Sequence, residues 1–242
     1  MIYLVKRELR LTDDRLIAVS EEEAHYLFKV RRVGREEPVF FYHEGVVYET
    51  VLAELSRKEG LFEVRARHDV ASRGRRVFVV IAAIEWSRLE EAVRNGVEAG
   101  AHGFFLFRAG RSNVPETAML KRVQRIEQII VSAASQSQRR CLPDIRGAGR
   151  EVIVKRPGRH IVFHPEADRP VTLEHFEGDG DIYLWIGPEG GFDESDLCFF
   201  ERAGLSFASL RTPVLRVENA VTVAVGLARH VVGYTAGVTL PE

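Results

Sequence analysis

Hydrophobic and polar residues alternate over most of the first 70 positions, which is typical of β-strands. The stretch "PVFFYHEGVVYETVLAEL" contains two strand-like runs on either side of His43-Glu44-Gly45, and this pattern predicts a β-hairpin. "LFEVRARHDV" predicts a further, half-buried strand. One short helix is expected in "EEEAHYLFKVRRV", because Ser20 and Glu23 have the spacing of a capping box and Gly34 supplies a stop. We therefore expect a small β-barrel-like domain with one helix.

From Val77 the pattern changes to apolar runs that alternate with helical periodicity. The runs "VFVVIAAI", "GFFLF", "HIVFH", "DIYLWIG" and "SFASL" predict strands, most of them buried on both faces. Helices are expected from a Ser87/Glu90 cap to Gly100, over about 118–139, from an Asp193 cap to Gly204, and from Val217 to about 234. This alternation predicts an α/β domain with a parallel sheet, covering 73–242, after a barrel-like domain of 1–72 and a polar linker at 71–76.

Composition is that of a soluble globular protein, with 45% hydrophobic and 29% charged residues in 242. No apolar run approaches the roughly 20 residues of a membrane span, and the N-terminus becomes charged from Lys6, unlike a signal peptide. Cys141 and Cys198 lack CxxC spacing, so reduced thiols without a disulfide or zinc are expected. We expect a cytoplasmic protein with no membrane segment and no metal.

Charge is distributed unevenly, although the net charge is only −1. Residues 73–150 hold 14 basic and 7 acidic side chains, whereas residues 151–242 hold 8 basic and 14 acidic ones. The middle of the chain is therefore the candidate for binding phosphates. The alternative is that basic and acidic parts pair with each other across the fold.

Three loops follow strands in the last third of the chain: "HPEA", "GPEGG" and "RTPVLR". Ligands of parallel sheets bind beyond the carboxyl ends of strands, and glycines let the backbone approach a ligand closely. A tight turn is the plain alternative for GPEGG, and a structural histidine is the alternative for His164. The turn after the first α/β strand reads "AIEWSRLEE", which lacks the glycines of a dinucleotide site or a Rossmann-type methyltransferase. P-loop, HExxH and GxSxG motifs are absent from the sequence.

"WIGPEGGF" followed by "LRTPVLRVENAVTVAVGLA" resembles the signature of the bacterial 16S ribosomal RNA (uracil-N3) methyltransferase family, of the SPOUT or trefoil-knot superfamily. "HYLFKVRRVGREEPVFF", "RLEEAVRNGVEAGA", Arg111-Ser112, "SQSQRRCLPDI" and "FHPEA" also match, in the family's order. The resemblance implies a PUA-like N-terminal barrel, a knotted C-terminal α/β domain, a homodimer and S-adenosylmethionine as cofactor. The implied cofactor residues are Phe163, His164, Pro165, Ile186, Gly187, Pro188, Glu189, Gly190, Gly191, Leu210, Leu215 and Arg216.

Catalysis on uracil N3 requires removal of a weakly acidic proton or stabilisation of the developing anion. Arg216 is the candidate to neutralise a uracil oxygen, while Glu218 or Glu189 would orient the ring or accept the proton. The alternatives are that Arg216 and Glu218 form a surface pair and that Glu189 caps the following helix.

RNA is the implied partner, either as 16S ribosomal RNA or within the small ribosomal subunit, and N3 is reachable only in an unpaired base. We expect Arg122, Arg125 and Arg139 on the solvent side of the long helix to bind RNA together with Lys29, Arg31 and Arg32. An ordinary solvated helix face is the alternative.

The sequence departs from the family near the expected substrate, at Val217, Asn219 and Ser135. Two other functions therefore stay open beside uridine-N3 methylation. One is 2′-O-ribose methylation of RNA, and the other is a non-catalytic, RNA-binding role in ribosome assembly.

Overall fold

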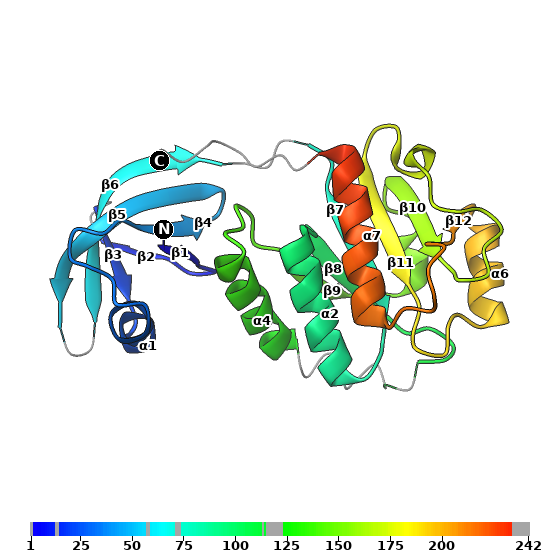
Figure 1. Cartoon of the computed structure of the whole chain (residues 1–242), viewed down its shortest axis with the longest axis horizontal. Helices are drawn as coiled ribbons and strands as arrows, with labels where there is room; N and C mark the ends of the chain where they lie inside the picture. Colours follow the sequence, from blue (N-terminus) through cyan, green and yellow to red (C-terminus); the bar gives the residue numbers. More distant parts are fainter. Residues whose placement is uncertain are drawn as a thin grey trace. The chain divides into compact units, whose positions relative to one another are not determined.

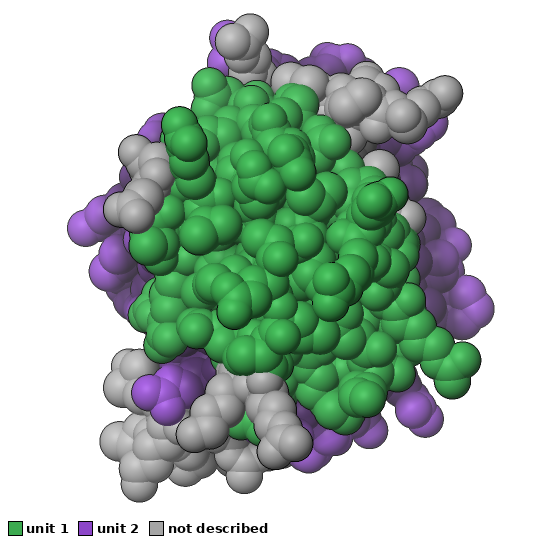
Figure 2. Space-filling model, turned by 90° about the vertical axis from the view of Figure 1, so that its left-hand side faces the viewer, with its two compact units in different colours: residues 1–73, 134–142, 236–242 green, residues 74–133, 143–235 purple. Residues whose placement is uncertain are grey.

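A computed structural model describes residues 2–12, 15–56, 59–70, 74–112, 114 and 123–233 of the chain (Figure 1). These residues form two compact units, coloured separately in Figure 2. The first unit contains the described residues up to position 70 together with 134–142, and the second contains those from 74 to 133 and from 143 to 233. No helix in the described part of the chain is long and apolar enough to cross a membrane.

The first unit is built on a mixed six-stranded sheet with the order β1-β4-β5-β6-β3-β2. Only β1 and β4 run parallel, and the other neighbours are antiparallel. The predicted hairpin is confirmed: His43 pairs with Val46, and Glu44 and Gly45 take φ values of 45° and 84° in the turn. The strands are β1 (Ile2–Val5), β2 (Arg10–Thr12), β3 (Leu16–Val19), β4 (Val39–His43), β5 (Val46–Leu55) and β6 (Gly60–Asp69).

One short helical segment accompanies this sheet, as predicted. Helix α1 (Glu21–His25) begins with the expected capping box of Ser20 and Glu23 and continues as a π-helix, η1 (Tyr26–Val30). Leu27 of η1 is fully buried and packs in one cluster with Phe41 and Phe62 of the sheet. The helix is therefore held against the sheet by its apolar face, while Glu21 and Glu22 are exposed and Glu23 is half-buried and pairs with Lys6.

The second unit contains a parallel six-stranded sheet with the order β12-β10-β11-β7-β8-β9, which confirms the predicted α/β fold. The strands are β7 (Val77–Ala82), β8 (Gly103–Phe107), β9 (Asp144–Gly147), β10 (Gly158–Phe163), β11 (Asp181–Ile186) and β12 (Ser206–Ala208). The helices are α2 (Trp86–Ala99), α4 (Val123–Gln136), α5 (Arg150–Ile153), η2 (Leu173–Phe176), α6 (Glu194–Arg202) and α7 (Val217–Val232).

Both faces of the parallel sheet are covered. Val80, Phe107 and Trp185 belong to a buried cluster that also contains Phe200 of α6. Helices α2 and α7 pack together, and α7 contacts β7 and β11 (Figure 1). Glycine is required at position 96 of α2, because a Cβ there would lie 2.8 Å from the Phe104 ring and 3.1 Å from the side chain of Val221.

Two predicted helix boundaries are wrong. Glu85, not Ser87, caps α2, and its carboxylate accepts a hydrogen bond from the backbone N–H of Ser87 at 3.1 Å. The described helix α4 ends at Gln136 rather than Arg139, because the chain turns at Gln138, which has a φ of 52°. Strand β9 and helix α5 were not predicted, since each is only four residues long.

Candidate functional site

The carboxyl ends of β10, β11 and β12 lie level with one another at one edge of the parallel sheet. Phe163 pairs with Ile186 of β11 on one side and with Ala208 of β12 on the other. The three loops expected to bind a ligand therefore leave the sheet from adjacent positions. The structure brings Phe163, Ile186 and the residues that directly follow each of the three strands to this edge. The role of the sequence-predicted cofactor residues in binding stays a prediction.

Backbone groups fasten the loop after β10 to the loop after β12. The His164 N–H donates to the carbonyl of Ala208 at 3.0 Å, and the hydroxyl of Ser209 donates to the carbonyl of Pro165 at 3.2 Å. Leu210 and Leu215 are half-buried along the second loop. These hydrogen bonds join the two loops into one border of the edge.

The GPEGG loop after β11 forms a tight turn closed by a hydrogen bond from the Gly191 N–H to the Pro188 carbonyl at 2.8 Å. Gly191 has a φ of +71°, and no described atom lies within 4 Å of the place a Cβ would occupy. Glycine is therefore favoured here for its left-handed conformation, and its open side leaves the backbone accessible to a ligand.

Two arginines from other loops contact the GPEGG loop. Arg111, which follows β8, donates to the carbonyl of Gly190 at 2.6 Å. Arg88 in the first turn of α2 places Nε 3.6 Å from Oε1 of Glu189, and both side chains are partly exposed. The alternative that Glu189 caps the following helix is wrong, because Asp193 caps α6. Arg111 was noted in the sequence only as part of a motif, and neither contact was predicted.

A buried carboxylate lies at the start of α7. Glu218 is 5% exposed, and its Oε2 atom has no hydrogen-bond partner among the described residues. Arg216 occupies the N-cap position of the same helix and is exposed. The alternative of a surface pair between these two residues is wrong, because Glu218 is buried. An unpartnered buried carboxylate is costly for stability and is available to hydrogen-bond a ligand.

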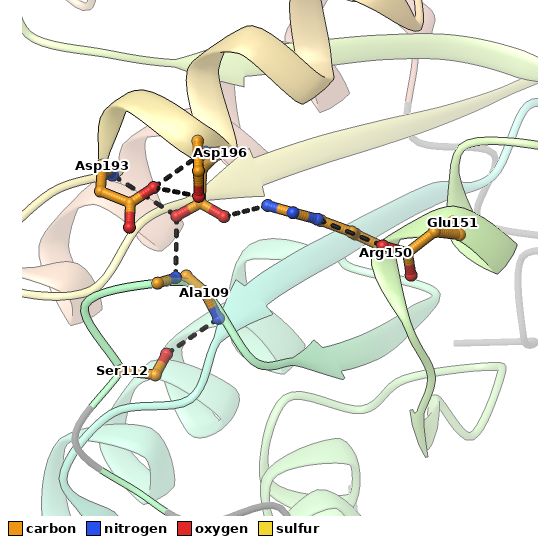
Figure 3. Close-up of polar contacts among 8 residues, drawn as sticks. Ala109, Ser112, Arg150, Glu151, Asp193 and Asp196 are labelled. Atoms are coloured by element: carbon orange, nitrogen blue, oxygen red, sulfur yellow. Dashed lines mark hydrogen bonds and ion pairs between the residues drawn. The ribbon is translucent and has the colours of Figure 1, made fainter.

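A second buried carboxylate, Asp196, joins three loops at the ends of β8, β9 and β11 (Figure 3). Its Oδ2 atom accepts a hydrogen bond from the Gly110 N–H at 2.9 Å, and its Oδ1 atom forms an ion pair with Arg150. The guanidinium of Arg150 also lies 4.5 Å from the ring centroid of Phe199. The network borders a cavity of about 410 Å³. Sequence reasoning missed this network, because Asp196 reads as an ordinary acidic residue of a first helical turn.

The residues expected to bind RNA have different surroundings. Lys29, Arg31 and Arg32 are all exposed at the end of η1. Arg125 is exposed on α4, where its guanidinium forms an ion pair with Glu90 that raises the pKa of Arg125. Arg139 is 1% exposed, and its Nη2 atom lies 3.0 Å from the Cys141 sulfur.

The expectation that Arg139 lies on the solvent side of the long helix is therefore wrong, because α4 ends before it and its side chain is buried. Arg122 lies outside the described residues. The described residues contain no group of three or more His, Cys, Asp or Glu side chains that is suited to a metal ion.

The fold and the edge just described define an α/β protein with a glycine-rich loop at the carboxyl end of a parallel sheet, where ligands of such sheets bind. The family model of the RNA methyltransferase domain matches residues 72–229, so the chain belongs to this family of RNA methyltransferases. The match includes the whole parallel sheet and all three loops of the candidate site.

Curated relatives match over most of their length. The chain is 28% identical to ribosomal RNA small subunit methyltransferase E of Mycobacterium bovis, covering 89% of this chain and 87% of the relative. It is 26% identical to the protein of the same name from Aquifex aeolicus, covering 88% and 93%.

Solved structures share the fold. Ribosomal RNA small subunit methyltransferase E of Neisseria gonorrhoeae, bound to S-adenosyl methionine, has a TM-score of 0.81 at 21% identity, covering 95% of this chain and 97% of that chain. A Legionella pneumophila protein solved with its bound cofactor has a TM-score of 0.80 at 19% identity, covering 95% and 97%.

Proposed function

We propose that the chain transfers a methyl group from S-adenosylmethionine to N3 of a uridine in 16S ribosomal RNA. The observation that carries this proposal is the level register of Phe163, Ile186 and Ala208, which gathers the three loops at one edge. The names of the curated relatives and the cofactor in the Neisseria gonorrhoeae structure support the same activity. The resemblance of the loop motifs to the uracil-N3 family supplies the position of the methyl group.

The residues at this edge fit S-adenosylmethionine. The open backbone at Gly191 allows close approach, and the half-buried Leu210 and Leu215 offer apolar contact to a ligand. The cofactor supplies an electrophilic methyl group, so the protein needs to bind, orient and exclude water rather than provide a nucleophile of its own. Arg111 holds the carbonyl of Gly190 and thereby fixes the shape of the loop.

Glu218 is the strongest candidate for handling the N3 proton. Its carboxylate is buried, and its Oε2 atom has no partner in the described part of the chain, so it has an unused acceptor. In this proposal Oε2 accepts the proton or orients the ring, and the exposed guanidinium of Arg216 neutralises the charge that develops on a uracil oxygen. Glu189 is the weaker candidate, because Arg88 already pairs with it.

The remaining parts of the proposal concern RNA and assembly. Lys29, Arg31 and Arg32 form an exposed basic cluster suited to the RNA backbone. Reversing their charges should weaken RNA binding and flatten its dependence on salt concentration. A PUA-like character of the first unit, a trefoil knot around the three loops and a homodimer are the further features that the family resemblance implies.

The test is nucleoside mass spectrometry. Small ribosomal subunits from cells lacking the gene are incubated with the purified protein and S-adenosylmethionine, and the RNA is then digested. The proposal expects 3-methyluridine, whereas a 2′-O-methylated nucleoside would establish ribose methylation instead. If no product forms and calorimetry detects no binding of S-adenosylmethionine, the chain is a non-catalytic assembly factor.

A further inference from the structure

A second cavity of about 630 Å³ lies in the second unit, between the start of α2 and the first turns of α4. It is separate from the three loops of the proposed cofactor site, since none of their residues lines it. Its lining residues are Glu85, Trp86, Ser87, Glu90, Gln124, Arg125 and Gln128. The set includes an indole ring and two carboxamides, which can stack on a planar polar ligand and hydrogen-bond to it.

Two carboxamides form one wall of the cavity. Gln124 and Gln128 are four residues apart on α4 and therefore lie on the same face of the helix, one turn apart. Both are exposed, and neither has a hydrogen-bond partner among the described residues. A carboxamide offers a donor and an acceptor side by side, which matches the edge of a nucleobase.

An aromatic residue of α2 lines the cavity on the side opposite α4. Trp86 is the first residue of α2, is half-buried, and contributes to the lining. Indole rings stack on bases of any sequence, with about 1–3 kcal/mol per base. A stacking surface and two hydrogen-bonding amides in one cavity favour a base over a compact anion.

The charges of the described lining residues favour a neutral ligand over phosphate. Glu90 is paired with Arg125, so these two charges balance. Among the described lining residues Glu85 is then the remaining charged side chain, and the hydrogen bonds that it accepts from Ser87 lower the pKa of this carboxyl, so that it stays ionised. A phosphate would be repelled here, whereas the neutral base of a nucleotide would not.

We propose that this cavity binds an unpaired nucleobase of the RNA substrate, next to the base that is methylated. The inference rests on the proposed function, which supplies RNA as the ligand. The cavity is close to the candidate site in space, because Arg88, in the same helical turn as Trp86, pairs with Glu189 of the GPEGG loop. The bound base is a neighbour of the target, because amides that read its Watson–Crick edge would cover the N3 atom that must stay free.

The test is a fluorescence titration with a short single-stranded oligoribonucleotide and with the same oligomer lacking its bases. The protein has two tryptophans, and the second, Trp185, is fully buried. The intact oligomer should quench the emission of Trp86, and the abasic oligomer should not. In Trp86→Phe the quenching should disappear. Equal quenching by the abasic oligomer would show backbone binding and overturn the proposal.

Gln124 and Gln128 are exposed, so both can be replaced without disturbing the fold, and this permits a second measurement. The double variant Gln124→Ala/Gln128→Ala should bind the intact oligomer about tenfold more weakly, in line with the loss of one bidentate base contact. Gln136→Ala is the matched control, since it removes an exposed carboxamide of the same helix outside the cavity. Unchanged affinity in the double variant would overturn the proposal.

Calorimetry with S-adenosylmethionine separates this inference from the proposed function. The wild type and both cavity variants should bind the cofactor equally well. Failure of all three to bind it would refute the methyltransferase function while leaving the fluorescence result to decide on the base-binding cavity.

Discussion

The starts of α6 and α7 each bury a carboxylate, but only one of the two is fully engaged. Asp196 is 0% exposed and binds Arg150 and the Gly110 N–H, whereas Glu218 is 5% exposed with Oε2 unpartnered among the described residues. A buried charge that is paired holds structure together, and removing its partner is costly. A buried carboxylate with an unused acceptor lowers stability and is explained by function. The comparison therefore separates a structural region from a candidate catalytic one.

The largest effect is expected from Glu218→Gln. The amide keeps the size of the side chain but cannot accept a proton, so methyl transfer should slow by about 10²–10⁴-fold, the usual contribution of a general base. The free energy of unfolding should stay the same or rise, because the charge is removed from a buried site. Single-turnover rates and urea unfolding measure the two quantities. If the variant kept its full rate of methyl transfer but lost stability, Glu218 would be a structural residue like Asp196 and not a catalytic one.

Asp196→Ala should have the opposite profile. It leaves the Arg150 guanidinium and the Gly110 N–H without their partner, so the free energy of unfolding should fall by about 3–5 kcal/mol. Urea unfolding followed by fluorescence measures this loss. Glu151→Gln is the control, since it removes an exposed carboxylate that also pairs with Arg150 and should cost less than about 1 kcal/mol. Equal losses of unfolding free energy in the two variants would mean that the burial of Asp196 does not contribute to stability.

The edge with the three loops and the Asp196 network also differ in how much of them the sequence predicts. The strands β10 and β11 and the GPEGG loop were predicted because each is a local signal: an apolar run that ends at glycine and proline. The Asp196 network was not, because Arg150 is 46 residues away and the two meet only through the fold. Strand β9 was missed because it is only four residues long and because its pairing with β8, not its own pattern, makes it a strand.

A glycine pair tests whether the edge near Glu218 is a cofactor site. Gly191 and Gly204 have φ values of +71° and +72°, and no described atom lies within 4 Å of either Cβ position. Alanine at either position should therefore cost about the same, 1–2 kcal/mol, from left-handed strain. Only Gly191→Ala should also weaken binding of S-adenosylmethionine, by about tenfold or more, because its Cβ would occupy the open side of the loop. Calorimetry on both variants decides. Equal affinities would place the cofactor elsewhere.

The smallest effect concerns His160, which is half-buried in the sheet. It sharpens the comparison because both of its ring nitrogens have hydrogen-bond partners. Burial lowers its pKa below the ordinary value of 6.5, against a hydrogen bond to the Arg156 carbonyl that raises it. Its Nδ1 atom accepts a hydrogen bond from the Trp185 indole at 3.2 Å, and its Nε2 atom lies 2.9 Å from that carbonyl. Since the unfolded chain binds the proton more readily, the stabilisation is fully present above pH 6.5 and is lost as the pH falls below it. Urea unfolding between about pH 8 and pH 5.5 should therefore show a slope that His160→Gln reduces. An identical slope in the variant would show that His160 binds a proton as easily in the folded sheet as in the unfolded chain. Partial burial in this sheet would then be insufficient to keep a histidine ring neutral.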